Sequence, residues 1–227
     1  MEGIAVSVII PAFNGEAFLA EAVSSIITQD CRSLEIIIVD DGSTDATAEV
    51  ARRFGSAIQY HYQKNSGPGS ARNRGVSLAK GGFLAFLDAD DLWMKDKLWR
   101  QMAAFEADPE LEMVFGHIQQ FYSPELTEEE RAGIGMPVES MRGYHAGAML
   151  IKKEAFMQVG FFNETLKIGE FVDWYARAME MGLKQTMLPE VLMNRRIHKT
   201  NLGISQRDHR RVYVHALKAA LDRRRCG

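Results

Sequence analysis

The chain has 227 residues, of which 46% are hydrophobic and 25% are charged, and its formal net charge is −3. This length fits one domain with at most a small appendage, and the hydrophobic content is sufficient for a sizeable core. A weakly acidic chain has no general attraction for nucleic acid, which excludes nucleic-acid binding as the main activity, although arginines gather toward the C-terminal end.

The cysteines and the hydropathy pattern indicate a soluble protein of a reducing compartment. Cys31 and Cys226 lie far apart in sequence and suggest neither a disulfide framework nor a metal-binding spacing. The N-terminal apolar run is too short for a signal peptide, and no stretch approaches about 18 uncharged apolar residues. We therefore expect a cytoplasmic location.

Four β-rich segments alternate with helical patterns in the first half of the chain. They are Val6–Pro11, Leu34–Asp40, Ile58–Gln63 and Phe83–Asp88. Residues 8–10 and 36–39 are continuously apolar, as in strands that are covered on both faces of a parallel sheet. A helix after the second strand is expected to begin with Ser43 or Thr44 as its N-cap. This order predicts an α/β protein with right-handed crossovers.

The second half is less regular. Residues 112–121 indicate a strand, and residues 123–140 an acidic mobile loop with glycine and proline and no core pattern. An apolar run at 146–151 follows, then helices from about Lys153 and over 171–181, and a short strand at 186–193. A basic helix is expected over 205–227.

Asp88, Asp90 and Asp91 follow the fourth predicted strand directly. Ligands of open α/β sheets bind outside the carboxyl ends of the strands, so these acids are candidates for a site. Bunched carboxylates repel unless a proton or cation relieves them, and Mg²⁺ or Mn²⁺ binds through one or two carboxylates plus substrate phosphates. The alternative is that Asp90 or Asp91 caps a helix that begins near Asp96.

Four segments in series resemble the motifs of family 2 of the inverting, nucleotide-sugar-dependent GT-A glycosyltransferases. They are VSVIIPAFN, IIIVDDGSTD, NSGPGSARNRG and FLAFLDADD, in that family's order over residues 6–93. Weaker similarity continues through HAGAMLIKKEAFMQVGFFNE to about residue 200. The resemblance implies a Rossmann-like, mixed and mostly parallel sheet flanked by helices over residues 1–204, with a nucleotide-sugar-binding half (1–95) and an acceptor half (96–204).

The resemblance also implies a nucleotide-diphosphate donor, with a UDP-sugar preferred, and Mn²⁺ or Mg²⁺ as cofactor. Arg72 can fork onto ribose or phosphate oxygens, and Asp40 can accept from a base or ribose, while a turn role for Asp41 is equally plausible. The expected donor-binding residues are Pro11, Ala12, Phe13, Asn14, Glu16, Asp40, Asp41, Gly67, Arg72, Asp88, Ala89, Asp90 and Arg195. The segment SGPGSARNRG lacks the third glycine of a dinucleotide-binding fingerprint.

The expected metal ligands are Asp88, Asp90 and His198. The segment RRIHKTN resembles the late family segment in which Arg or His closes on the diphosphate or the metal, so Arg195 and Arg196 are candidates for phosphate contacts. A solvated side chain is the alternative for His198.

An inverting transfer needs a base for the acceptor hydroxyl, an effect of about 10²- to 10⁴-fold. The family commonly supplies it from an acidic pair, E-D, followed two residues later by another D. Here Glu170 keeps the first acid, Phe171 replaces the second and Asp173 keeps the last. We expect Glu170 to be the base, with Asp173 as the alternative, although Asp173 can instead pair with Arg177 at i+4.

Acceptor contacts are expected from His145 and from a sugar-stacking tryptophan, for which Trp93, Trp99 and Trp174 are candidates. Trp93 beside the aspartates is favoured, whereas Trp99 is expected in the core. The acceptor itself is a glycan, a lipid-linked molecule or a small molecule. The terminal helix is expected to pack on the domain, with a homodimer contact or anionic lipid at the inner face of the membrane as alternatives.

Two other classes of protein remain open. A sugar nucleotidyltransferase usually carries a glycine-rich, basic signature after its first strand, where PAFNGEAF offers one glycine and no basic residue. A nucleotide-sugar-binding protein with weak or no transfer activity is the other, because Phe171 occupies the position of an expected acid.

Overall fold

The apolar runs at the start of the chain form one half of a single sheet. The computed structural model describes residues 5–31, 33–134, 137–199 and 201. Its first four strands are parallel and lie in the order β3-β2-β1-β4. They are β1 (Val6–Ala12), β2 (Leu34–Asp40), β3 (Gln59–Tyr62) and β4 (Phe83–Phe86). The helices between them are α1 (Leu19–Ile27), α2 (Thr47–Arg52), the short 3-10 helix η1 (Gly55–Ala57) and α3 (Pro68–Leu78).

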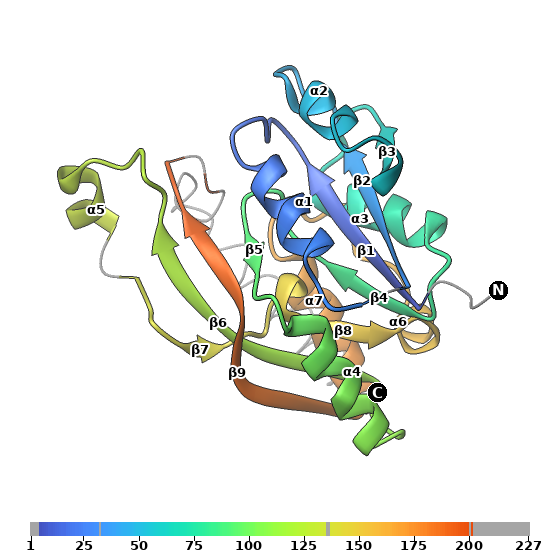
Figure 1. Cartoon of the computed structure of the whole chain (residues 1–227). Coiled ribbons are helices and arrows are strands. Elements are labelled where there is room, and N and C mark those ends of the chain that lie inside the picture. Colours follow the sequence, from blue (N-terminus) through green and yellow to red (C-terminus); the bar gives the residue numbers. More distant parts are fainter. Residues whose placement is uncertain (1–4, 32, 135–136, 200, 202–227) are drawn as a thin grey trace.

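The second half of the chain extends the same sheet. The added strands are β5 (Leu92–Trp93), β6 (Met113–Tyr122), β7 (Met141–Arg142), β8 (Leu150–Lys152) and β9 (Gln185–Ile197). Strand β8 is antiparallel to both β4 and β6, β9 is parallel to β6, and β5 and β7 pair with β9 and β6. In the described part of the chain the nine strands thus form one mixed sheet whose longest pairings are parallel. Figure 1 shows β6 and β9 running side by side toward α5 (Glu128–Ile134).

The sheet is covered by helices on both faces, because successive strand residues point to opposite sides. Ile10 and Ile38 pack with α1, α2 and α4 (Lys97–Ala107), whereas Ile9 and Ile37 pack with α3, α6 (Lys153–Val159) and α7 (Glu170–Glu180). All four isoleucines are fully buried, and each such side chain stabilises the fold by about 1.5–3 kcal/mol. The predicted α/β class, with strands covered on both faces, is confirmed.

Two strand ends differ from the prediction. Strand β1 continues through Pro11 to Ala12, with Pro11 opposite Val39 of β2. Pairing with β4 has already ended at Ile9, so the missing N–H of proline interrupts no second ladder. Strand β4 ends at Phe86, two residues before the predicted end, which leaves the first aspartate outside the ladder.

Three local predictions are wrong. Helix α2 begins at Thr47 without a side-chain cap, because the Ser43 hydroxyl instead accepts from the backbone of Asn14. The segment predicted as a loop without a core pattern contains α5 (Glu128–Ile134) and a buried Leu126. Trp99, expected in the core, is 56% exposed on α4.

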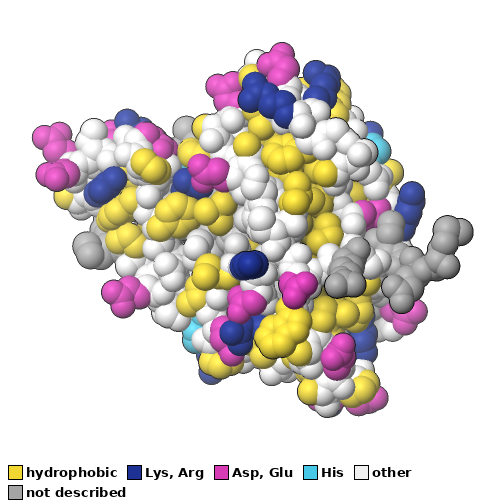
Figure 2. Space-filling view, viewed as in Figure 1, with side chains coloured by type: hydrophobic (Ala, Val, Ile, Leu, Met, Phe, Trp, Pro, Cys, Tyr) yellow, Lys and Arg dark blue, Asp and Glu magenta, His cyan; other side chains and the backbone are white. Residues whose placement is uncertain are grey.

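The surface carries charges of both signs. On the face shown in Figure 2, acidic and basic side chains are interspersed among hydrophobic ones. None of the helices in the described part of the chain combines the length and apolar character needed to cross a bilayer. The helix predicted over 205–227, with Cys226, lies outside the described residues, so the predicted packing, dimer and lipid contacts of that helix stay predictions.

Candidate active site

The acidic segment leaves the sheet in a tight turn at the carboxyl end of β4. The last sheet-like bond is donated by Leu87 N–H to the Ile9 carbonyl, and Asp91 N–H then donates to the Asp88 carbonyl. The chain next forms β5, and α4 begins only at Lys97, with Asp96 at its N-cap position. Asp90 and Asp91 therefore do not cap this helix, and the carboxylates are directed into the site.

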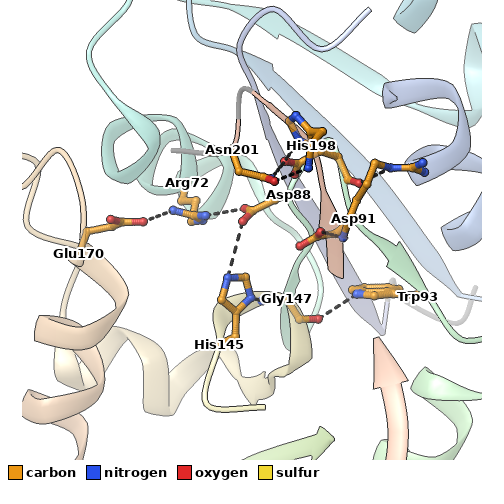
Figure 3. Close-up of polar contacts among 11 residues, drawn as sticks. Arg72, Asp88, Asp91, Trp93, His145, Gly147, Glu170, His198 and Asn201 are labelled. Carbon is orange, nitrogen blue, oxygen red and sulfur yellow. Dashed lines mark hydrogen bonds and ion pairs between the residues drawn. The ribbon is translucent and has the colours of Figure 1, made fainter. Parts of the chain in front are cut away.

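A buried ion-pair chain links two distant parts of the sequence. Arg72 of α3 is 4% exposed and donates through Nη2 to Asp88 Oδ1 at 2.5 Å and through Nη1 to Glu170 at the start of α7 (Figure 3). Burial lowers the pKa of Arg72, but the charges of Asp88 and Glu170 outweigh this effect and raise it. Burial likewise raises the pKa of Asp88, and Arg72, with His145, brings it below its ordinary value. Arg72 is thus a buried cation and not a helix-surface arginine.

His145 lies on the other side of Asp88. Its Nε2 is 3.8 Å from Asp88 Oδ2, and its Nδ1 accepts a hydrogen bond from Gly147 N–H at 3.1 Å (Figure 3). Burial lowers the pKa of His145, which favours the neutral ring. In a neutral ring whose Nδ1 accepts, Nε2 carries the proton.

Asp90 is bound by the segment that follows β9. Its Oδ2 lies 2.8 Å from His198 Nε2 and accepts from Asn201 Nδ2 at 3.1 Å. Asn201 Oδ1 in turn accepts from His198 N–H at 2.6 Å. The structure thus brings together Asp90 and His198, two of the expected metal ligands, whereas the sequence analysis missed Asn201, whose only signal was its place three residues after that histidine.

Burial and two neighbouring carboxylates disfavour the ionised form of Asp91. Its pKa is raised well above the ordinary value by burial and then by the charges of Asp90 and Asp88. A divalent cation would relieve this repulsion, so the donor set fits one. Oxygen or nitrogen atoms of Asp88, Asp91 and His145 lie within 4.8 Å of one another, a possible three-residue metal site. It shares only Asp88 with the expected set of Asp88, Asp90 and His198.

The two arginines of β9 differ in their surroundings. Arg195 is half-buried, and its charge acts on Asp88 and Asp91, so it faces the acidic cluster. Arg196 is 3% exposed and donates to the Asp90 carbonyl at 2.9 Å and to Glu21 at 2.5 Å. Its guanidinium is therefore already used to anchor the acidic turn, which argues against the predicted phosphate contact.

The acids after β2 hold the protein's own backbone. Asp40 accepts from Ser43 N–H at 2.8 Å and from Tyr60 O–H at 2.6 Å, and burial together with Asp40 raises the pKa of Tyr60. Asp41 accepts from Gly67 N–H at 2.7 Å, and also from Gln63 and Ser66. Both acids are nearly buried, so the turn role weighed for Asp41 is present at both positions.

The segment after β1 is fastened to the segment after β2. Asn14, at φ +49°, accepts from Thr44 N–H through its side chain, and Glu16 accepts from Ala46 N–H at the start of α2. Phe13 is 54% exposed beside the buried Ala12. Gly67 has φ +97°, a conformation that favours glycine, and precedes α3. These expected donor residues therefore lie at the carboxyl ends of β1 and β2, on the edge of the sheet that also carries the acidic turn.

The start of α7 combines an acid with an aromatic cluster. Phe171, which replaces the expected acid, is 8% exposed and contacts the rings of Tyr175, Trp174 and His145. Asp173 accepts from Arg177 Nε at 3.1 Å, the i+4 pair that the sequence offered as an alternative. Glu170 is thus the acid of this stretch that is linked to Asp88.

The tryptophan prediction is wrong. Trp93 is 4% exposed, its Nε1 donates to the Gly147 carbonyl at 2.9 Å, and Lys97 Nζ lies 4.1 Å from its ring centre. Trp174 is fully buried and donates to the Gly160 carbonyl. Neither ring is available to stack on a sugar, because pairing of β5 with β9 turns Trp93 into the core.

The fold is that of the GT-A glycosyltransferases. It superimposes on residues 1–349 of S. aureus TarS in complex with UDP-GlcNAc with a TM-score of 0.74 and 21% identity, over 95% of this chain and 65% of that fragment. A mannosyltransferase of Pyrobaculum calidifontis, in complex with GDP-Man and Mn²⁺, gives a TM-score of 0.74 and 21% identity over 98% of this chain and 65% of that one.

The sequence defines the family. Residues 7–163 match the profile of glycosyl transferase family 2, and the chain belongs to this family. An uncharacterized glycosyltransferase of Rickettsia typhi is 29% identical over 88% of this chain and 67% of its own length. The family resemblance and the glycosyltransferase class expected from the sequence are thereby confirmed.

Proposed function

We propose that this protein transfers a sugar from a nucleotide-diphosphate donor, a UDP-sugar, to an acceptor hydroxyl with inversion at the anomeric carbon and with assistance from a divalent cation. The observation that carries the proposal is the ion-pair chain Glu170–Arg72–Asp88, which connects a candidate base to the acidic turn. In a family 2 glycosyltransferase this turn is where the activated donor is expected.

The donor would lie along the carboxyl ends of the first strands. The nucleoside would contact residues 11–16, Asp40, Asp41 and Gly67, and the diphosphate would reach Ala89 and Arg195. Asp40 and Asp41 would act mainly by shaping the pocket, because their carboxylates already accept from the protein. A UDP-sugar is preferred in accord with TarS, which was solved with UDP-GlcNAc, and GDP-Man is the alternative offered by the archaeal enzyme.

The cation, Mn²⁺ or Mg²⁺, would be held by Asp88 and Asp90 with His198. When bound, it neutralises charge that develops on the leaving diphosphate. For His198 to contribute, its ring must leave its present contact with Asp90, or Asp90 must be shared between the two. Asp91 and His145 are the neighbouring alternatives.

Glu170 is the favoured base. Its carboxylate lies in the same chain of contacts as Asp88, and its ion pair with Arg72 orients it. Asp173 lies one turn further along α7, and its partner Arg177 also donates to the carbonyls of Val159 and Phe161. That set of bonds fits a structural role for Asp173 better than a catalytic one.

A donor-binding protein with weak transfer activity is the second candidate, because a buried Phe171 occupies the position of the missing acid. The acceptor, which is a glycan, a lipid-linked molecule or a small molecule, would approach beside His145. Membership of family 2 favours transfer over the nucleotidyl exchange that the sequence had left open.

Single-turnover incubation with a panel of radiolabelled nucleotide sugars and Mn²⁺ tests the proposal. Sugar transfer, or slow donor hydrolysis in the absence of acceptor, is expected for wild type. Glu170→Gln should lower turnover by about 10²- to 10⁴-fold while donor affinity is kept, and the exposed Glu180→Gln on the same helix is the control. Binding without any turnover would support the second candidate.

Calorimetry with UDP and Mn²⁺ tests the proposed role of the cation separately. Asp90→Asn should abolish the metal-dependent part of UDP binding, because it removes one charge from the proposed ligand set. An unchanged affinity for UDP in the presence of Mn²⁺ would refute the assignment of Asp90.

A further inference from the structure

Three consecutive backbone carbonyls beside His145 are each bound by a side chain from a single segment. Trp93 Nε1 donates to the Gly147 carbonyl at 2.9 Å, and Gln101 Nε2 donates to the Ala148 carbonyl at 2.9 Å. Lys97 Nζ donates to the Met149 carbonyl at 3.4 Å. Those carbonyls belong to η2 (Ala146–Ala148) and the residue that follows it.

The three donors are evenly spaced in sequence. Trp93, Lys97 and Gln101 are each four residues apart, so Lys97 and Gln101 share one face of α4 and Trp93 precedes it on β5. Lys97 and Gln101 are fully buried, and Lys97 Nζ also donates to Gln101 Oε1 at 2.7 Å. The three side chains thus form one connected array.

Burial of a lysine amine away from water costs free energy, and the hydrogen-bond partners of Lys97 indicate what this amine does. Burial lowers the pKa of Lys97 well below its ordinary value, and no ion pair of Lys97 is found among the described residues. Its hydrogen bonds go to a backbone carbonyl and to Gln101. Lys97 therefore acts as a hydrogen-bond donor to the loop and not as a countercharge.

The position of this loop determines which ring nitrogen of His145 accepts a hydrogen bond and which one faces Asp88. Gly147, whose carbonyl binds Trp93, donates its own N–H to His145 Nδ1 at 3.1 Å. A side chain at position 147 would require Met193 to shift, because a Cβ there would lie 2.7 Å from Met193 Sδ, and Met193 is fully buried. The peptide of Gly147 is fixed on both sides, and Nε2 of His145 faces Asp88 (Figure 3).

We propose that Trp93, Lys97 and Gln101 are positioning residues that fix the 145–149 loop, so that Nε2 of His145 faces Asp88 at 3.8 Å and presents an N–H donor to the bound sugar. In this arrangement Nε2 offers no lone pair, so His145 does not serve as the general base, and it could join Asp88 and Asp91 as a cation ligand only by losing this proton. The part of this inference that concerns the sugar rests on the proposed function, whereas the state of the ring does not.

The tautomer of His145 can be read directly in the full-length protein. Long-range ¹H–¹⁵N spectra of ¹⁵N-histidine-labelled protein, at a pH where the ring is neutral and with His145→Gln for assignment, should show Nε2 protonated and Nδ1 unprotonated. A wild-type ring protonated at Nδ1 would overturn the inference.

Two variants test the array, and two exposed positions beside it provide matched controls. Trp93→Phe removes the indole N–H and Lys97→Met removes the amine, and both should give a mixture of tautomers. Trp99→Phe and Lys95→Met, at exposed positions, should keep the wild-type tautomer. If Lys97→Met fails to fold, Trp93→Phe decides, since it keeps most of the ring volume. A pure Nε2–H tautomer in a folded Trp93→Phe protein would refute the role of the array.

A kinetic measurement tests the use of the donor. His145→Gln keeps an N–H near the position of Nε2 and should retain turnover within about tenfold of wild type, whereas His145→Asn should lose about 10- to 100-fold. Equal losses in both would refute the donor role. If no nucleotide sugar is turned over by wild type, the proposed function fails, and the tautomer spectra still decide the positioning inference.

Discussion

Replacing Arg72 by methionine is expected to destabilise the protein by about 3–5 kcal/mol. Arg72 is 4% exposed, and its removal leaves the Glu170 carboxylate, with 9% of its side chain exposed, without its cation. Asp88 loses the same partner but keeps 28% of its side chain in solvent, so it contributes less of the loss. Arg74→Met, at an exposed position on the same helix, should cost no more than about 1 kcal/mol, because its bond to the Tyr62 carbonyl is exposed.

Urea unfolding of the four proteins of a double-mutant cycle measures this effect. Wild type, Arg72→Met, Glu170→Gln and the double variant should give a coupling free energy of about 0.5–3 kcal/mol, because the neutral amide no longer needs the cation. A coupling near zero, with both single variants folded, would show that the buried pair does not determine stability and would refute the reasoning.

The pH dependence of the Arg72→Met effect has a defined sign. In wild type the pKa of Asp88 is below its ordinary value, and the stability from this carboxylate is present above about pH 4 and is lost as the pH falls through the folded pKa. In Arg72→Met the burial of Asp88 is no longer offset by the charge of Arg72, so the folded-state pKa of Asp88 rises. Protonation of Asp88 in acid then removes the unpaired buried charge, and this partly restores the stability of the variant. The stability gap should therefore narrow from about pH 7 to about pH 4, and a constant gap would contradict the assignment to Asp88.

Two further predictions concern packing and the buried lysine. Gly75→Ala should destabilise by about 1–3 kcal/mol in urea unfolding, because a Cβ there would lie 2.4 Å from Ile9 Cγ2. Gly133→Ala on α5, with no atom within 4 Å, should instead be neutral or stabilising by up to about 1 kcal/mol. Burial lowers the pKa of Lys97 in the folded protein. Between that pKa and about 10.4, the unfolded chain binds a proton that the folded chain lacks, so the free energy of unfolding rises with pH. Wild type should therefore gain stability relative to Lys97→Met from about pH 7 to about pH 9.5, and a pH-independent difference would argue against a buried amine.

The strands and the place of the site could be predicted from the sequence. Apolar runs such as residues 36–39 favour strands that are covered on both faces, and β2 forms there. An acidic segment directly after a fourth such run must emerge at the carboxyl edge of a parallel sheet, which is where Asp88 lies. These conclusions depend on local pattern and on the fixed direction of parallel strands, and four motifs in series were enough to indicate the family.

The partners of each site residue depended on the tertiary structure. Burial of Trp93 could not be predicted from local pattern, because it follows from pairing of a two-residue strand with β9, roughly a hundred residues later in the chain. The sequence favoured Glu170 over Asp173 without indicating the partner of either, and the structure places Glu170 against Arg72, 98 residues away, and Asp173 against Arg177. His145 was marked only as an acceptor contact, and only the fold shows that its Nδ1 accepts a hydrogen bond from Gly147 N–H.

The amino-acid sequence by itself determined the order of the first four strands and their helices, the family and the edge of the sheet on which the acids gather, because hydrophobic periodicity and strand direction act over a few residues. The tertiary structure alone decided which charges meet and which rings are covered. Those outcomes depend on side chains brought together by packing across the sheet, and on the solvent that this packing excludes.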